Sequence, residues 1–151
     1  MLNYGLVGLG NLGEKIARNL LKKKFTLKVY DKDQEKVNKL TKIGAISSLS
    51  TADAAEDVDG LITCLPSPKI STEVMTGEKG AIQKMKPGST WIETSTTDIK
   101  DLQLVSKIAE KQNINTIEAP VTGGVHRAEK GIITVLVGAE KKNFLKHEEA
   151  I

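Results

Sequence analysis

VGLGNLG, residues 7–13, is the stretch that decides the fold, because its glycines follow the spacing G-x-G-x-x-G. A short apolar run precedes it, and an amphipathic helical pattern continues from it to Lys24. In such a turn between strand and helix, Gly8 permits a tight bend, Gly10 lets a pyrophosphate approach the backbone, and Gly13 lets the helix pack closely on the strand. The alternative is a purely structural turn.

Asp31 favours the binding interpretation. It ends the next predicted strand, FTLKVYD at residues 25–31, at about the twenty-residue distance that dinucleotide sites show. Its carboxylate can accept hydrogen bonds from both ribose hydroxyls and would repel the 2′-phosphate of NADP. Lys32 and Lys36 could partly neutralise such a phosphate. We therefore predict a site for NAD, with NADP less favoured. The alternative for Asp31 is an acid that simply faces solvent.

The rest of the chain alternates between strand and helix patterns. The predicted strands are residues 3–8, 25–31, 45–47, 58–66, 90–94, 115–120 and 131–138. The predicted helices are residues 11–24, 32–44, a short segment from 51, parts of 69–85, 98–113 and 140–151. This alternation predicts an α/β fold of the Rossmann type, with a doubly wound, mostly parallel sheet and helices on both faces. Without repeats or linkers, residues 1–151 are expected to form one dinucleotide-binding domain.

Composition excludes several classes of function. The formal charge of +3 comes mainly from lysines interleaved with acids, and Arg18 and Arg127 are the only arginines, so a nucleic-acid partner is not expected. One cysteine, Cys64, and two histidines give no metal cluster. No apolar run reaches the roughly 18 residues that span a bilayer, and no signal-peptide pattern opens the chain. We expect a cytoplasmic protein without a membrane partner.

Four stretches together resemble the β-hydroxyacid dehydrogenase family, of the 3-hydroxyisobutyrate dehydrogenase and tartronate semialdehyde reductase type. They are GLVGLGNLGEKIARNLLKK (5–23), LITCLPSP (61–68), IETSTTD (92–98) and EAPVTGGVHRAEKGIITVLVG (118–138). The resemblance implies an NAD-dependent oxidoreductase that transfers hydride between the cofactor and a small 3-hydroxy acid or its semialdehyde.

The resemblance also implies roles for single positions. Backbone groups of four residues would hold the pyrophosphate, and three further residues would border or contact the cofactor near the nicotinamide. The first four are Leu9, Gly10, Asn11 and Leu12, and the other three are Leu65, Pro66 and Thr96. Leu12 replaces the usual methionine of the glycine loop, and Ile99 replaces a proline that usually follows the hydroxyl pair.

Thr122, Gly123 and Gly124 match the family's substrate-binding Ser-Gly-Gly segment, with threonine in place of serine. Bare backbone there can approach a small carboxylate and donate N–H groups to it. The alternative is a loop that needs glycine dihedral angles. His126 and Arg127 follow, and Arg127 could pair with a substrate acid or be a solvated residue at a helix start.

The family's catalytic lysine and a nearby asparagine belong to a glycine-rich segment that precedes an all-helical second domain. No such segment occurs before Ile151, so we assign no catalytic residue and expect this chain alone to be inactive. We expect it to be the cofactor half of a longer enzyme or a natural truncated product. We also expect apolar residues near the C-terminus, namely Phe144, Leu145 and Ile151, to lack packing partners, and the complete protein to form a homo-oligomer.

Two alternatives stay open at this point. One is a non-catalytic NAD(P)-binding sensor or interaction module. The other is a relative of 6-phosphogluconate dehydrogenase or of the imine reductases, against which Asp31 argues because NADP users commonly carry a neutral or basic residue there.

Overall fold

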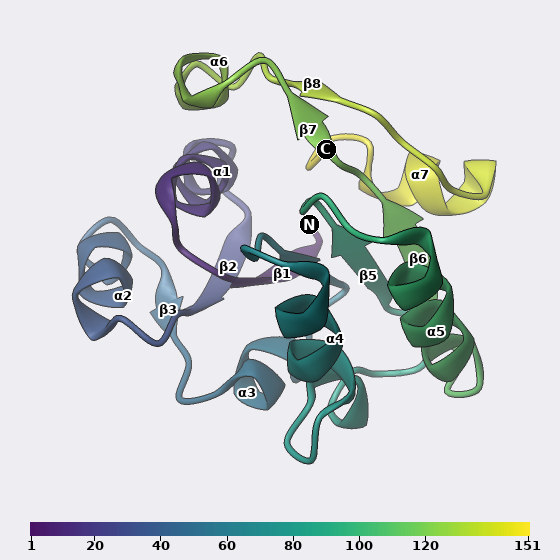
Figure 1. Ribbon diagram of the computed structural model, residues 1–151. Coiled ribbons are helices and arrows are strands. Elements are labelled where there is room, and N and C mark those ends of the chain that lie inside the picture. Colours follow the sequence, from purple (N-terminus) through teal and green to yellow (C-terminus); the bar gives the residue numbers. More distant parts are fainter.

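Six parallel strands form the central sheet, in the order β3-β2-β1-β4-β5-β6 (Figure 1). The computed structural model describes residues 1–151. The strands are β1 (Asn3–Val7), β2 (Thr26–Tyr30), β3 (Ile46–Ser47), β4 (Gly60–Thr63), β5 (Thr90–Glu93) and β6 (Asn115–Glu118). The strand order reverses between β1 and β4, which is the Rossmann arrangement expected from the sequence.

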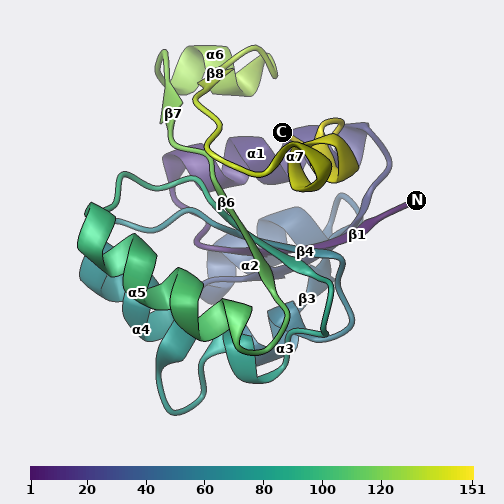
Figure 2. The same cartoon turned by 90° about the vertical axis from the view of Figure 1, so that its right-hand side faces the viewer.

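Helices cover both faces of this sheet (Figures 1 and 2). They are α1 (Asn11–Lys22), α2 (Gln34–Thr41), α3 (Thr51–Ala55), α4 (Pro68–Thr76), the 3₁₀ turn η1 (Ala81–Gln83), α5 (Ile99–Glu110), α6 (Val125–Glu129) and α7 (Lys141–His147). One core cluster unites the sheet with α1 and α2, and a second unites it with α3, α4 and α5. The doubly wound fold is therefore confirmed.

Burial on both faces explains why the middle strands carry large apolar side chains at adjacent positions. In β4, Leu61 enters the core under α3 to α5 and Ile62 enters the opposite core; in β5, Trp91 and Ile92 divide in the same way. All four side chains are at most 3% exposed. Continuous apolar runs are typical of parallel strands covered by helices on each side.

The segment after β6 differs from the prediction. A strand at residues 131–138 was expected to continue the sheet, but only Thr134–Val135 is a strand (β8), and it pairs antiparallel with β7 (Val121–Thr122) in a separate ribbon. A single bridge joins Glu118 to Gly138. Gly123 and Gly124 adopt φ of 115° and 81°, which glycine tolerates, and together with α6 they form the connection across which β7 and β8 pair.

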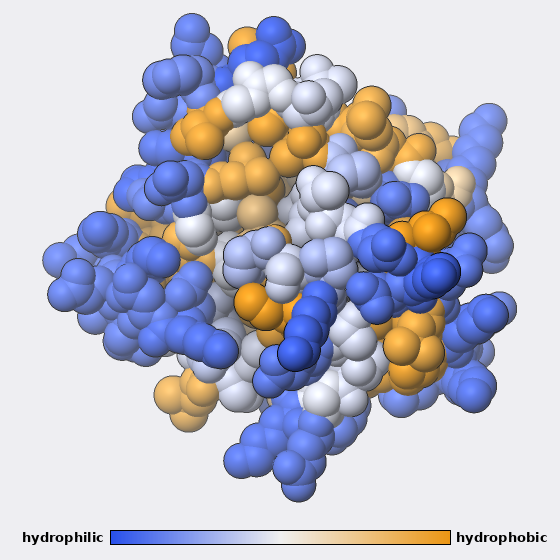
Figure 3. Space-filling model, in the orientation of Figure 1, coloured by the Kyte–Doolittle hydropathy of each residue, from blue (hydrophilic) through white to orange (hydrophobic).

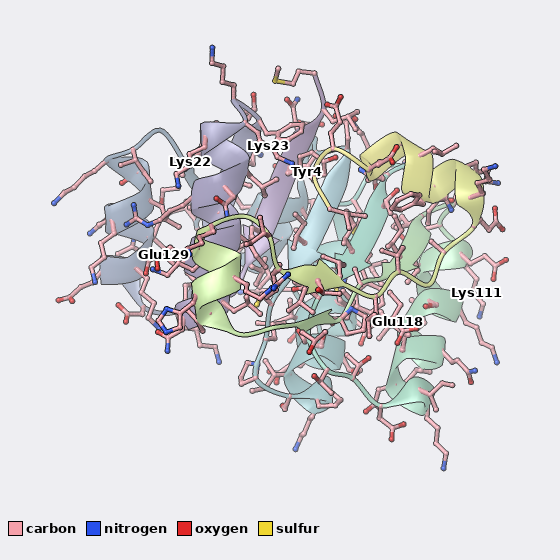
Figure 4. All side chains as sticks on the ribbon, turned by 90° about the horizontal axis from the view of Figure 1, so that it is seen from above. Tyr4, Lys22, Lys23, Lys111, Glu118 and Glu129 are labelled. Atoms are coloured by element: carbon pink, nitrogen blue, oxygen red, sulfur yellow. The ribbon has the colours of Figure 1, made fainter.

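Helix α6, for which the sequence offered only a possible helix start near Arg127, lies in the excursion formed by residues 119–138 and is fastened to α1. The side-chain amide of Asn19 donates to the carbonyl of Ala128 at 2.6 Å, and Lys15 lies 3.5 Å from Glu129. Figure 4 shows Glu129 on α6, with α6 lying beside α1. These contacts hold the excursion against the α1 side of the molecule.

Exposed hydrophobic side chains gather on the same excursion. Figure 3 shows them over the upper part of the molecule, where Figure 1 places α6, β7 and β8. The exposed apolar residues of this segment are Val125, Ile132, Leu136 and Val137. Apolar exposure was expected only near the C-terminus, so the exposed side chains of this segment were not predicted.

The C-terminal residues are better packed than expected. Ala150 and Ile151 lie against the core on the α1 side, whereas Leu145 remains 54% exposed. His147 is completely buried, with Nδ1 2.9 Å from the Tyr4 hydroxyl and Nε2 2.9 Å from the Thr90 hydroxyl. A neutral imidazole can donate through one nitrogen and accept at the other, so both hydroxyls are satisfied. This histidine anchors α7 to β1 and β5.

None of the helices is long and apolar enough to cross a membrane.

The environment of His147 predicts a loss of stability in acid. Burial, reinforced by Lys146 and opposed by Asp59, lowers the pKa of His147 from 6.5 to about 4. The pKa of His147 is lower in the folded than in the unfolded protein. Neutral His147 therefore contributes its full share to the free energy of unfolding above about pH 6.5, and this contribution is lost as the pH falls toward 4. It amounts to roughly 3 kcal/mol. Chemical denaturation across this range should show the loss in the wild type and in a variant of the exposed histidine, His126→Gln. The loss should be absent in His147→Gln; equal pH profiles for all three proteins would contradict the assignment.

Candidate dinucleotide-binding site

A cleft of about 930 Å³ opens at the carboxyl ends of the strands, between the turn after β1 and the turns after β4 and β5. In open α/β sheets, ligands bind at this position, where the strand order reverses. Nine of the predicted cofactor residues line it: Gly8, Gly10, Asn11, Leu12, Gly13, Asp31, Leu65, Pro66 and Thr96. Their roles toward a cofactor stay a prediction, but the fold brings them to one place.

The three glycines of the turn meet different constraints. Gly8 has φ of 95°, and a Cβ there would collide with the carbonyl oxygen of Cys64. A Cβ on Gly13 would collide with the carbonyl oxygen of Gly8, which shows how closely α1 packs on the turn. Gly10 has φ of −64° and nothing within 4 Å of an added Cβ. Gly8 and Gly13 are thus required by the fold itself, whereas Gly10 leaves open space in the cleft.

The N-terminus of α1 faces this cleft without a side-chain cap. Neither backbone nor side-chain acceptors within the protein take up the N–H groups of Asn11, Leu12 and Gly13. The first turn of any helix has such free donors, and the helix dipole makes them favourable for anions. The arrangement can therefore receive a diphosphate.

Asp31 has a second task that sequence reasoning missed. Its Oδ2 accepts the N–H of Leu9 at 2.6 Å, and its Oδ1 accepts the N–H of Asp33 at 2.9 Å. Leu9 is buried and does not line the cleft, so its N–H holds the acid rather than facing a pyrophosphate. Lys36 lies 3.7 Å from Asp33, and its charge is directed to that neighbour. Each carboxylate oxygen of Asp31 keeps a lone pair for a ribose hydroxyl.

The other wall of the cleft depends on the buried Glu93, which sequence reasoning also missed. Its carboxylate accepts the N–H of Ser95 at 2.8 Å and contacts the hydroxyl of Ser71 in α4. Ser95 Oγ in turn accepts the N–H of Leu65 at 2.8 Å. Burial is the main cause that raises the pKa of Glu93, and hydrogen bonds from Ser71, Ser95 and Thr63 oppose it. A glutamate inside an apolar strand, in WIE, was the available signal.

The predicted substrate segment lies next to the cleft rather than in its lining. Val121 lines the cleft, whereas Thr122, Gly123 and Gly124 are exposed beyond it. The side chain of Arg127 folds over Gly123, so that a Cβ added there would lie 2.9 Å from Arg127 Cδ. Binding of a substrate by this segment stays a prediction.

The fold, the uncapped helix start and the acid at the end of β2 together define a dinucleotide-binding α/β domain. The family described as the NAD binding domain of 6-phosphogluconate dehydrogenase matches residues 3–151. The chain belongs to this family.

Curated relatives give the resemblance more detail. The chain is 37% identical to the 3-hydroxyisobutyrate dehydrogenase of Rattus norvegicus over 97% of its own length, but it covers only 44% of that protein. It is 36% identical over 93% of its length to a probable 3-hydroxyisobutyrate dehydrogenase of Dictyostelium discoideum, again covering 44%. Both relatives are described as mitochondrial. The chain therefore spans less than half the length of these relatives.

A solved structure agrees with these sequences. The crystal structure of 3-hydroxyisobutyrate dehydrogenase from Salmonella typhimurium superposes on 99% of this chain with a TM-score of 0.93, at 27% identity, and the chain covers 52% of it. The resemblance to the β-hydroxyacid dehydrogenases, predicted from the sequence, is confirmed. The chain is an NAD(P)-binding domain of that family of oxidoreductases.

The contrast between Gly10 and Gly13 predicts two separable effects. Gly10→Ala should keep the melting temperature within about 2 °C, because its Cβ meets no protein atom, yet weaken NAD binding about tenfold or more by occupying the space for the pyrophosphate. Gly13→Ala should destabilise the protein by roughly 3 kcal/mol or more, because α1 must move away from Gly8. Thermal unfolding and calorimetric titration with NAD measure both. If Gly10→Ala binds NAD as tightly as the wild type, the pyrophosphate does not lie against this turn.

Proposed function

We propose that the complete protein transfers hydride between NAD and a small 3-hydroxy acid or its semialdehyde. The observation that carries the proposal is the cleft in which the glycine turn, Asp31 and the turns after β4 and β5 meet. The relatives described as 3-hydroxyisobutyrate dehydrogenases support the substrate class. A calorimetric titration of the 151-residue chain with NAD is the first test, and absence of binding would contradict the proposal.

Different residues of the chain would bind different parts of the cofactor and the substrate. The first turn of α1 receives the diphosphate through its free N–H groups, and Asp31 accepts the adenosine ribose hydroxyls. Leu65, Pro66 and Thr96 border the nicotinamide, which when bound supplies the hydride acceptor or donor. Thr122, Gly123 and Gly124 then bind the carboxylate of the substrate beside it, with the backbone as donor.

Proton transfer needs a group that this wall of the cleft does not offer. Residues from the turns after β4, β5 and β6 line it: Cys64, Leu65, Pro66, Thr94, Ser95, Thr96 and Val121. Cys64 is the one titratable side chain among them, and burial raises the pKa of its thiol. An alcohol oxidation must pass its hydroxyl proton to a base as the hydride leaves. We therefore propose that a lysine outside residues 1–151 takes this proton, as the family resemblance implies.

The cellular compartment and the oligomeric state of the complete protein are predictions from the sequence. The cytoplasmic location expected from the sequence stays a prediction, beside two relatives that are described as mitochondrial. The homo-oligomer expected of the complete protein also stays a prediction.

Asp31 predicts a preference for NAD over NADP. Its charge would face the 2′-phosphate, and the nearby Lys36 is paired with Asp33. Asp31→Asn keeps an oxygen for the N–H of Leu9 but removes the charge, so the preference should fall by about tenfold or more without damage to the turn. Asp31→Ala also loses the bond to Leu9 and should weaken binding of both cofactors. Calorimetric titrations with NAD and NADP decide the matter; a wild type that prefers NADP would overturn the assignment.

The neutral lining near the nicotinamide predicts that the 151-residue chain binds NAD without turnover. Positioned proton transfer typically contributes about 10²–10⁴-fold to the rate, and the turns after β4, β5 and β6 offer only the Cys64 thiol as a titratable side chain. Absorbance at the NADH band would be followed with 3-hydroxyisobutyrate, glycerate and 4-hydroxybutyrate as substrates. Turnover at an ordinary dehydrogenase rate would place the proton acceptor within these residues and refute the assignment of roles.

A further inference from the structure

Glu93 occupies an unusual place for a carboxylate. It is the last residue of β5, it is 0% exposed, and it points to the same face of the sheet as Trp91, beneath α4. No lysine, arginine or histidine forms an ion pair with it. An unpaired buried carboxylate is costly unless hydrogen bonds satisfy it, so its retention requires an explanation.

Its hydrogen bonds join three separate segments of the cleft wall. One carboxylate oxygen accepts the N–H of Ser95 at 2.8 Å, at the start of the turn after β5. The other contacts the hydroxyl of Ser71, in the first turns of α4. The hydroxyl of Thr63, at the end of β4, also bonds to the carboxylate and accepts the indole N–H of Trp91 at 2.8 Å.

Ser95 extends the network to the lining itself. Its hydroxyl oxygen accepts the N–H of Leu65 at 2.8 Å, which links the turn after β4 to the turn after β5. Leu65, Ser95 and the following Thr96 all line the cleft, whereas Glu93 does not. The carboxylate thus acts on the cleft only through the residues that it holds.

We infer that Glu93 is a positioning residue, which holds Leu65 and the Ser95–Thr96 turn in the arrangement that receives the nicotinamide half of the dinucleotide. This inference rests on the proposed function of the cleft. The glycine turn and Asp31, which would receive the adenosine diphosphate half, share no hydrogen bond with this network, although Gly8 packs against Leu65. The two halves of the ligand are therefore held by independent sets of bonds.

This independence gives a test that separates positioning from general stability. Calorimetric titrations use two probes, NADH for the whole site and ADP for the adenosine half alone. Glu93→Ala should weaken NADH binding about tenfold, the size expected for the loss of one or two buried hydrogen bonds, and leave ADP affinity within about twofold. Glu93→Gln keeps an oxygen for the N–H of Ser95 and should restore most of the NADH affinity.

Two further variants complete the design. Ser95→Ala removes the acceptor of the Leu65 N–H and the bond of the serine hydroxyl to Glu93, but keeps the N–H of residue 95. It should weaken NADH but not ADP binding, so it decides the matter if Glu93→Ala does not fold. Glu118→Ala is the matched control, since Glu118 is the partner of Glu93 in the register of β5 and β6 and is exposed; Figure 4 shows it on β6. It should change neither affinity.

Two results would overturn the inference. One is unchanged NADH affinity in Glu93→Ala, or in Ser95→Ala where the first variant is unfolded. The other is an equal loss of NADH and ADP affinity in these variants, which indicates a role in folding alone. A wild type that binds ADP but not NADH would instead contradict the proposed function, and it is seen before any variant is made.

Discussion

The structure depends on the close approach of α1 to the turn that follows β1. The backbone of Gly13 packs against the carbonyl of Gly8, and Gly8 packs against the carbonyl of Cys64, the residue after β4, with no room for a Cβ at either glycine. This contact fixes where α1 begins relative to the sheet and directs its free N–H groups to the point where the strand order reverses. The anion-binding geometry and the helix packing are therefore one feature, and a side chain at Gly13 would remove both.

The two walls of the cleft meet different electrostatic requirements. On the side of β2, Asp31 remains accessible to a ligand while the N–H groups of Leu9 and Asp33 hold it in place. On the side of β4 and β5, the carboxylate of Glu93 is buried behind serine and threonine hydroxyls, so the turns after these two strands present neutral groups to the cleft. The carboxylate of Asp31 thus lies where it can bind a ribose, whereas the buried carboxylate of Glu93 holds neighbouring segments of the protein in place.

Several features followed from local patterns and several did not. The glycine spacing, the alternation of strands and helices and the acid after β2 were readable, because each depends on neighbours within about twenty residues. The β7–β8 ribbon was not, since GIITVLVG has the composition of a sheet strand, and its pairing with β7 instead of the sheet depends on the path of the chain through Gly123, Gly124 and α6. His147 gave no signal either, because its partners Tyr4 and Thr90 are distant in the chain and meet only after β1 and β5 pack against α7.

The sequence by itself determined the class of fold, the position of the cleft and nine of the residues that line it, because periodicity and glycine spacing are local properties of the chain. The family followed from the order and spacing of four motifs, and the match over residues 3–151 agrees. Only the tertiary structure decided that Leu9 holds Asp31, that Glu93 connects α4 with the turns after β4 and β5, and that His147 secures the C-terminal helix. These depend on hydrogen bonds between segments that are far apart in the chain, and burial selects such partners only when the sheet has formed.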